Sequence, residues 1–183
     1  REYEQAGGKH LLLGSALTPK WQNDIEWSVG GAPYLDVISV DYYGHDKEYV
    51  LEYALATKRP VINIEFNFSV EDRGMRCFHG GYVKHSEEKG IAYRRMLENC
   101  AVNNYIIGFC PFVMFDQPVT GRTCSNYGAW GENYNTGFVN TADQPYEEYL
   151  QKVIGTNNRL FDIHLGIIKP VMYEPWAYRK TVL

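Results

Sequence analysis

The sequence predicts an α/β fold in which parallel strands alternate with helices. Four apolar segments of strand length are separated by stretches with helical periodicity. No Asn-Gly or Asp-Gly pair joins two of these segments as a tight hairpin turn. Apolar residues make up 45% of the 183 residues and charged residues 22%, a balance that supports a packed core.

The strand predictions rest on four runs of apolar residues, at 11–17, 34–42, 60–68 and 105–115. Between the second and third runs, Asp46 is a candidate N-cap. The helix that follows it would carry an apolar side made of Val50, Leu51, Ala54 and Leu55. A weaker helical pattern covers 19–29, ahead of the second strand.

Two more helices are expected in the second half of the chain. Ser86, with Glu87 and Glu88 behind it, begins one that carries Ala92, Met96 and Cys100 at four-residue steps. Asp143 and Pro145 begin the other, and Gly155 is expected to end it. Its apolar stripe is Tyr146, Tyr149, Leu150, Val153 and Ile154.

Charge and composition narrow the classes of function. The net charge of -4 and a pI near 5.7 argue against binding to nucleic acid or another polyanion. No run approaches the 18 apolar residues of a transmembrane helix, so no membrane-spanning segment is expected. Aromatic residues reach 15%, which fits core packing and also stacking on sugars.

Common cofactor motifs are missing from the sequence. It contains no GxGxxG, GxxxxGK[ST], GxSxG or HExxH, and its four cysteines form no CxxC pair. The cysteines are expected to be mostly small buried hydrophobes, with a disulfide to Cys124 left open. His79 and His85 form the nearest histidine pair, for which a metal role is the weaker alternative.

The most informative local pattern lies in the third strand. Ile62, Ile64, Phe66 and Phe68 share one parity, and Val61, Asn63, Glu65 and Asn67 share the other. One face is therefore apolar, while the other becomes polar toward the carboxyl end. A barrel explains this, because polar strand ends point into the mouth where barrel active sites lie. At that position Glu65 either forms a salt bridge at the rim of the barrel or serves as a catalytic carboxylate.

Several motifs resemble clan A glycoside hydrolases, which are retaining (β/α)8-barrel enzymes. The segments HLLLGSAL, YLDVISVDYYG and KRPVINIEF resemble their strands five, six and seven. GFCPFVMFDQPVTGR, followed by GENYNTGFVNTADQPYEEYL, resembles strand eight and the next loop of β-agarase-like enzymes. The combination of DQPVTGR and GENYNTGFV is the most specific part, and the similarity runs from about residue 9 to about residue 158.

This resemblance implies roles for individual residues. Glu65 corresponds to the nucleophile, and Asp41 and Tyr43 correspond to polar sixth-strand residues near it, with the Tyr43 hydroxyl donating to the nucleophile. Further sugar-binding residues fall in the loop after strand eight, namely Asp116, Gln117, Arg122, Glu132 and Asn133. The alternative for this loop is self-stabilisation, in which Arg122 pairs internally with Asp116 or Glu132.

The acid/base of this clan, at the end of strand four, has no counterpart, since Glu2 and Glu4 lie in a charged, loop-like stretch. A full barrel takes about 250 residues, so four strands imply half of one. We therefore expect residues 1–160 to form the C-terminal half, strands five to eight, of a TIM (β/α)8 barrel. Residues 161–183 would be a tail that packs on the barrel or leads to a further segment. The missing N-terminal half-barrel or a partner chain would complete it.

The sequence departs from the family at strand eight. A His-Trp-Phe type segment is replaced by Cys110, Pro111 and Phe112, and Pro111 removes a backbone donor. Tyr127 and Trp130, in an extra stretch, are candidate replacements for the lost aromatic platform.

Three hypotheses for function follow. The first is a retaining glycosidase acting on a β-galactosidic, agarose-like polysaccharide, with this chain lacking the acid/base half and inactive alone. The second is a non-catalytic descendant that binds polysaccharide, and the third is a structural fragment. No cofactor and no metal are implied, because the mechanism needs only carboxylates. A large polysaccharide substrate implies an extracellular or periplasmic location.

Overall fold

The computed structural model describes residues 2–8, 10–14, 25–45, 47–75, 81–122 and 132–171. Within these ranges the chain forms two compact units. Unit 1 comprises 1–42, 46–66 and 103–110, and unit 2 comprises 43–45, 67–102 and 111–183. The expected helix cap Asp46, the cysteines Cys77 and Cys124, the histidine His79 and the aromatics Tyr127 and Trp130 lie outside the described residues.

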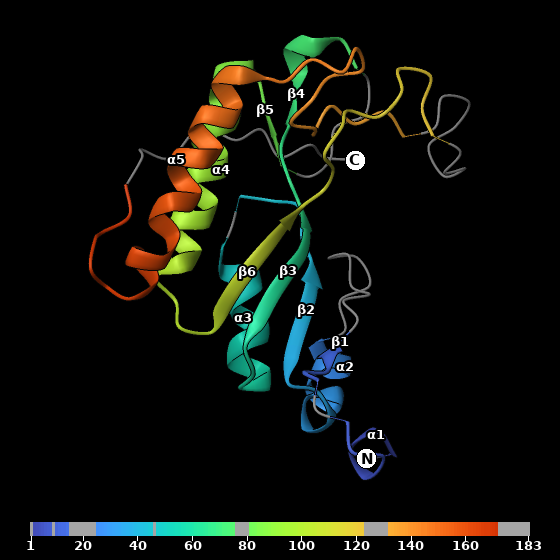
Figure 1. Cartoon of the computed structure of the whole chain (residues 1–183), viewed down its shortest axis with the longest axis vertical. Helices are drawn as coiled ribbons and strands as arrows, with labels where there is room; N and C mark the ends of the chain where they lie inside the picture. Colours follow the sequence, from blue (N-terminus) through green and yellow to red (C-terminus); the bar gives the residue numbers. More distant parts are fainter. Residues whose placement is uncertain are drawn as a thin grey trace. The chain divides into compact units, whose positions relative to one another are not determined.

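Unit 1 is built on a four-stranded sheet in the order β1-β2-β3-β6 (Figure 1). The strands are β1 (Leu13–Gly14), β2 (Val37–Asp41), β3 (Val61–Phe66) and β6 (Ile106–Pro111). The β1–β2 and β2–β3 pairs are parallel, and the arrows of β2, β3 and β6 point the same way in Figure 1. This confirms the prediction of an α/β fold with a parallel sheet, and each strand lies inside a predicted segment.

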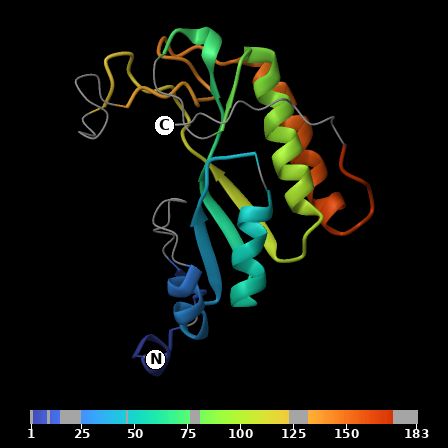
Figure 2. The same cartoon turned by 180° about the vertical axis from the view of Figure 1, so that it is seen from behind.

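Helix α3 (Lys47–Thr57) covers one face of this sheet (Figure 2). The stacked rings of Tyr42, after β2, and Tyr49, in α3, have centroids 4.4 Å apart. The buried side of α3 includes Val50 and Ala54, as predicted, both 0% exposed. It differs at Leu55, which is 61% exposed, and it also includes Tyr49 and Tyr53. The tyrosines pack against the sheet because their rings bury a larger area than the side chain of Leu55 would. Helix α2 (Ile25–Gly31) confirms the later part of the weak helical pattern.

Unit 2 contains the packed helix pair α4 (Ser86–Ala101) and α5 (Glu147–His164), which lie side by side in both views (Figures 1 and 2). The first turn of α4 is capped by Glu88, whose carboxylate accepts hydrogen bonds from the backbone N–H groups of Lys84 and His85. Ala92, Met96 and Cys100 are buried, as predicted. A small parallel pair, β4 (Ser69–Val70) with β5 (Tyr82–Val83), was not predicted because two-residue strands have no periodicity.

The prediction that the last helix ends at Gly155 is wrong. Helix α5 continues to His164, past the expected domain boundary at 160, and Gly155 lies inside it. Glycine costs a helix interior only about 1 kcal/mol, which burial further along can offset. Thr156 and Ile163 supply that burial, being 0% and 2% exposed.

Short elements complete the described fold. They are α1 (Glu2–Gln5), the 3-10 turn η1 (Ala32–Tyr34) and the 3-10 turn η2 (Glu71–Arg73). Of the two described cysteines, Cys100 is buried as expected, whereas Cys110 is exposed.

Candidate active site

Two carboxylates stand side by side at the carboxyl ends of neighbouring strands in unit 1. Asp41 ends β2, and Glu65 is the penultimate residue of β3. The strand register aligns Asp41 with Glu65, although the preceding pair is Val40 with Asn63. Between these two pairs, β3 therefore has one residue more than β2, which is a β-bulge. Both carboxylates are half-buried, so Glu65 lies at an accessible strand end, where barrel enzymes place catalytic groups.

Asn63 holds the bulge that aligns these carboxylates. Its side-chain amide donates to the Tyr42 carbonyl oxygen at 2.9 Å, and its oxygen accepts from the Tyr42 N–H at 3.0 Å. The structure differs here from the expected polar face, because Asn63 is 0% exposed and does not line an open mouth. A buried amide needs partners, and the backbone of Tyr42 supplies them.

Burial and charge act together on Asp41. Partial burial, followed by the negative charge of Glu65, raises the pKa of Asp41 from 3.8 to about 6. Asp41 is consequently protonated over a pH range in which an ordinary aspartate is ionised. Such a shift in a carboxyl group at a strand end is typical of functional sites.

In unit 2, Asp116 organises the loop that follows β6. Its Oδ1 accepts from the Gly137 N–H at 2.8 Å, and its Oδ2 accepts from the Tyr146 hydroxyl at 2.5 Å. Phe115 and Val139 form a parallel bridge beside it. Residue 137 must be glycine, because a Cβ atom there would lie 2.3 Å from the Asp116 backbone nitrogen. This close approach gives the glycine of GENYNTGFV a physical reason.

The other predicted loop residues bind one another or nearby backbone. Gln117 accepts from the Tyr134 N–H at 2.7 Å through its side chain and donates to Glu132 at 3.4 Å.

Arg122 forms an ion pair with Glu132, and its backbone N–H donates to the Glu132 carbonyl at 2.8 Å. The Asn133 amide donates to the Val119 carbonyl at 3.1 Å. Self-stabilisation of the loop is thus observed, with Glu132 rather than Asp116 as the partner of Arg122.

Tyr43 and Phe112 form an aromatic contact at the start of the same loop. Their rings meet edge to face with centroids 6.3 Å apart, and the Arg122 guanidinium lies 5.3 Å from the Phe112 ring centre. Phe112 was noted in the sequence only as a departure from the family pattern. The expected hydrogen bond from Tyr43 to the nucleophile stays a prediction.

Comparison with known proteins shows to which proteins the chain is related. Beta-agarase B of Vibrio sp. (strain JT0107) is 37% identical over 142 residues, a match that covers 75% of this chain and 14% of that protein. The chain is a homologue of beta-agarases. A solved exo-beta-agarase structure agrees, with a TM-score of 0.75 and 28% identity, and the match covers 86% of this chain and 20% of that one.

A second agarase crystal structure superposes with a TM-score of 0.76 and 28% identity over 88% of this chain and 22% of that chain. No family model matches the chain. The beta-agarase homologue therefore spans 14% of the length of the curated relative and about a fifth of the solved structures. The fold that it shares with them is α/β with a parallel sheet.

Sequence reasoning missed Asn135 and Lys89, two buried polar residues of unit 2 in this beta-agarase homologue. It placed a third, Asn67, on the polar face of a strand, whereas Asn67 is 1% exposed. Asn135 donates to the Val70 carbonyl and accepts from the Val70 N–H, both at 2.7 Å. Asn67 donates to the Thr136 carbonyl at 2.6 Å and accepts from the Tyr149 hydroxyl at 2.9 Å. Lys89 Nζ, which is fully buried, donates to the carbonyls of Asn135 and Gly137 at 3.2 and 2.8 Å. The run of small polar residues in GENYNTG was the available signal for the loop, whereas nothing in the pattern around Lys89 marked it.

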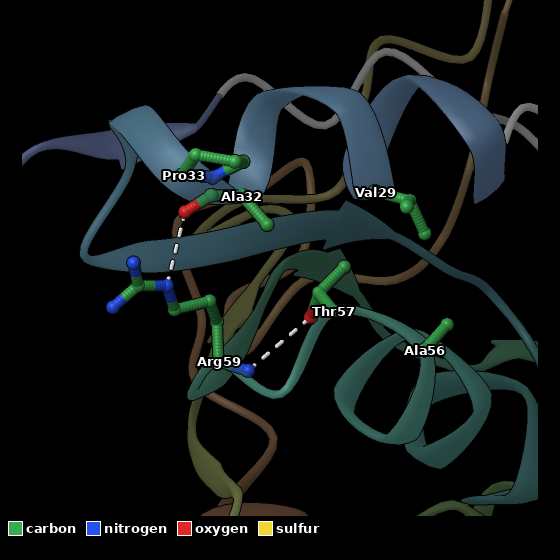
Figure 3. A pocket seen from close by; sticks show the side chains of 6 residues that line it. All are labelled: Val29, Ala32, Pro33, Ala56, Thr57 and Arg59. Carbon is green, nitrogen blue, oxygen red and sulfur yellow. Dashed lines mark hydrogen bonds between the residues drawn. The ribbon is translucent and has the colours of Figure 1, made fainter.

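A shallow pocket lies at the opposite end of the strands in unit 1 (Figure 3). Its lining comes from α2, η1, the end of α3 and the residue pair before β3: Val29, Ala32, Pro33, Ala56, Thr57 and Arg59. The Arg59 side chain is hydrogen-bonded within this pocket, because its Nε donates to the Ala32 carbonyl at 3.0 Å. Ligands of parallel α/β sheets bind outside the carboxyl ends of the strands, so this pocket at the amino ends is not a candidate for the catalytic centre.

Within the described ranges, no group of three or more histidine, cysteine, aspartate or glutamate side chains is arranged to hold a metal ion. None of the described helices combines the length and hydropathy that crossing a bilayer requires.

Proposed function

We propose that the chain carries the nucleophile of a retaining glycoside hydrolase that cleaves β-galactosidic bonds in an agarose-like polysaccharide. The observation that carries this proposal is the position of Glu65, half-buried at the carboxyl end of a parallel strand and aligned with Asp41. Homology to beta-agarases supplies the substrate class.

In this mechanism Glu65 attacks the anomeric carbon as an ionised carboxylate. The bond from that carbon to the leaving oxygen breaks, and a second carboxyl group, ~5 Å away, gives the leaving oxygen a proton. A glycosyl ester on Glu65 results, which water then hydrolyses with the second group acting as base. We assign that second group to a preceding strand outside these 183 residues.

The proposed architecture is the C-terminal half of a (β/α)8 barrel, with β1, β2, β3 and β6 as strands five to eight. The parallel order of these strands supports it, and the solved agarases are about five times as long as the matched region. β1 and β6 are the two edges of the sheet, and each would pair with a strand of the remaining half.

The loop of unit 2 is proposed to bind sugar. Its polar side chains are held by one another, so they would present preorganised groups and the Phe112 ring to a sugar. Because a polysaccharide cannot enter a cell intact, we propose an extracellular or periplasmic location.

The test uses the native polypeptide that contains these residues. Glu65→Ala should lower the release of reducing ends from agarose by roughly 10³-fold or more, while azide should restore turnover. Azide then attacks from the face that Glu65 used, so the product is an α-galactosyl azide. The exposed helix residue Glu52 provides the matched control, and Glu52→Ala should keep the wild-type rate. A β-azide product, or an unchanged rate for Glu65→Ala, contradicts the assignment.

The second candidate function is polysaccharide binding without catalysis. It is favoured by the fact that Asp116, Gln117, Glu132 and Asn133 all bind within the loop, and by Pro111 in β6. Under this alternative, the wild-type polypeptide binds agarose but releases no reducing ends, and Glu65→Ala leaves the binding constant unchanged.

A further inference from the structure

The carboxylate pair at the ends of β2 and β3 contains one member that the displacement mechanism does not use. Asp41 and Glu65 are aligned on adjacent strands, and both are half-buried. Two neighbouring carboxylates in a partly desolvated site cannot both ionise at their ordinary pH, because each charge disfavours the other. One of the two must keep a proton to a higher pH.

The surroundings assign that proton to Asp41. Across β2, the described β1 residues Leu13 and Gly14 carry no charge and pair with Val37 and Ile38 rather than with Asp41. The first turn of α3 carries Lys47 and Glu48, and on β3 the charged neighbour is Glu65. Within the described residues, burial and then the Glu65 charge raise the pKa of Asp41 to about 6. The proton therefore lies on Asp41 below that pH.

We propose that Asp41 is a positioning residue that holds a proton while Glu65 carries its negative charge and releases it to water when that charge is lost. This inference rests on the proposed role of Glu65. Neutral Asp41 leaves the nucleophile as the single negative charge of the pair. Because Asp41 does not compete for the anomeric carbon, Glu65 alone attacks.

The charge on Glu65 disappears when its oxygen forms the glycosyl ester. The leaving oxygen receives its proton from the acid/base, so the proton on Asp41 is not consumed. Without the Glu65 charge beside it, the pKa of Asp41 falls, and Asp41 ionises at a pH between its two pKa values. Its new negative charge then faces the oxocarbenium-like transition state of the hydrolysis step. Linkage requires that rising pH favours the ester across this interval, because ester formation releases a proton.

The first experiment measures the Asp41 titration by carboxyl ¹³C NMR in the native polypeptide. Glu65→Gln removes the charge with little change of shape, and the pKa of Asp41 should fall from about 6 toward 3.8. Burial remains in this variant, so the fall is partial. The control Glu52→Gln, on an exposed part of α3, should leave the titration unchanged. An Asp41 titration that stays near 6 in Glu65→Gln overturns the inference.

The second experiment forms the ester directly with an activated 2-deoxy-2-fluoro-β-galactoside. Peptide mass analysis should find the sugar on Glu65, and the Asp41 titration should fall by the same amount as in Glu65→Gln. If the sugar attaches to Glu65 but the titration does not move, the inference is overturned and the proposed function stands. If Glu65→Gln lowers the titration but no sugar attaches, the proposed function fails while the coupling of the two carboxyl groups is supported.

A third variant separates positioning from mere structure. Asp41→Asn keeps the shape and cannot ionise, so the part of the pH dependence of trapping that Asp41 causes between about 4 and 6 should disappear. A purely structural Asp41 would instead change the trapping rate by one factor at every pH, which would overturn the inference.

Discussion

The Tyr146 hydroxyl donates a 2.5 Å hydrogen bond to Asp116 Oδ2, which ties the residue before α5 to the loop after β6. Burial, followed by the Asp116 hydrogen bond and charge, raises the pKa of Tyr146. The phenol therefore stays protonated and donates a hydrogen bond to the carboxylate. The Arg73 guanidinium lies 3.5 Å above the same ring. Tyr146 thus links three segments of unit 2 through one side chain.

Removing this hydroxyl should weaken unit 2. Tyr146→Phe keeps the ring beneath Arg73 but leaves Asp116 with one hydrogen bond fewer in a buried place. We expect a loss of about 1–3 kcal/mol in the free energy of unfolding, measured by urea denaturation. Tyr105→Phe, at a 44% exposed position, is the control and should change little. Equal stability of the two variants would show that the Asp116 bond contributes nothing.

Asn63 should contribute to the stability of unit 1, because its side chain is buried and hydrogen-bonded. Asn63→Ala removes both hydrogen bonds to the Tyr42 backbone and leaves a small cavity beside β2. The expected loss is about 2–4 kcal/mol in the free energy of unfolding. Asn104→Ala, at an exposed site, provides the comparison. If both substitutions cost the same, the bulge does not depend on Asn63.

Lys89 is a buried amine whose hydrogen bonds fix the loop carbonyls of Asn135 and Gly137. Burial, followed by the charge of Arg73, lowers the pKa of Lys89, while Asp116 acts in the opposite direction. Lys89→Met loses two hydrogen bonds but also removes the cost of burying a polar amine, so a net loss of about 1–2 kcal/mol is expected. Thermal unfolding measures it, with exposed Lys84→Met as control. A more stable Lys89→Met variant would mean that desolvation outweighs the bonds.

His45 should make unit 2 sensitive to acid. Burial, followed by the charge of Arg95, lowers the pKa of His45 from 6.5 to about 4, although its bond to the Tyr82 carbonyl raises it. The unfolded chain therefore binds this proton more readily between pH 4 and 6.5. Its contribution to stability is complete above 6.5 and is lost as the pH falls through about 4.

Imidazole ¹H NMR titration checks this directly. His45 should remain neutral at pH 5, and His45→Gln should flatten the fall in unfolding free energy between pH 6.5 and 4. A His45 titration midpoint near 6.5 would contradict the prediction.

The sequence by itself determined the four strands of the unit 1 sheet, most of the helices and the candidate nucleophile. Apolar runs bounded by turn-forming residues produce β2, β3 and β6 wherever they pack, so local pattern was sufficient. Glu65 could be named because a carboxylate near the end of such a run must reach the strand's carboxyl edge. The resemblance to beta-agarases was likewise visible in the motifs of the sequence, and the chain is their homologue.

Tertiary structure alone decided which polar groups meet. The alignment of Asp41 with Glu65 depends on a bulge, and a one-residue shift in register changes every cross-strand partner without changing the pattern of either strand. Helix α5 passes Gly155 because burial of Thr156 and Ile163 outweighs local propensity. Pairing energies of this kind come from residues far apart in the chain, so the sequence pattern around any one residue does not contain them.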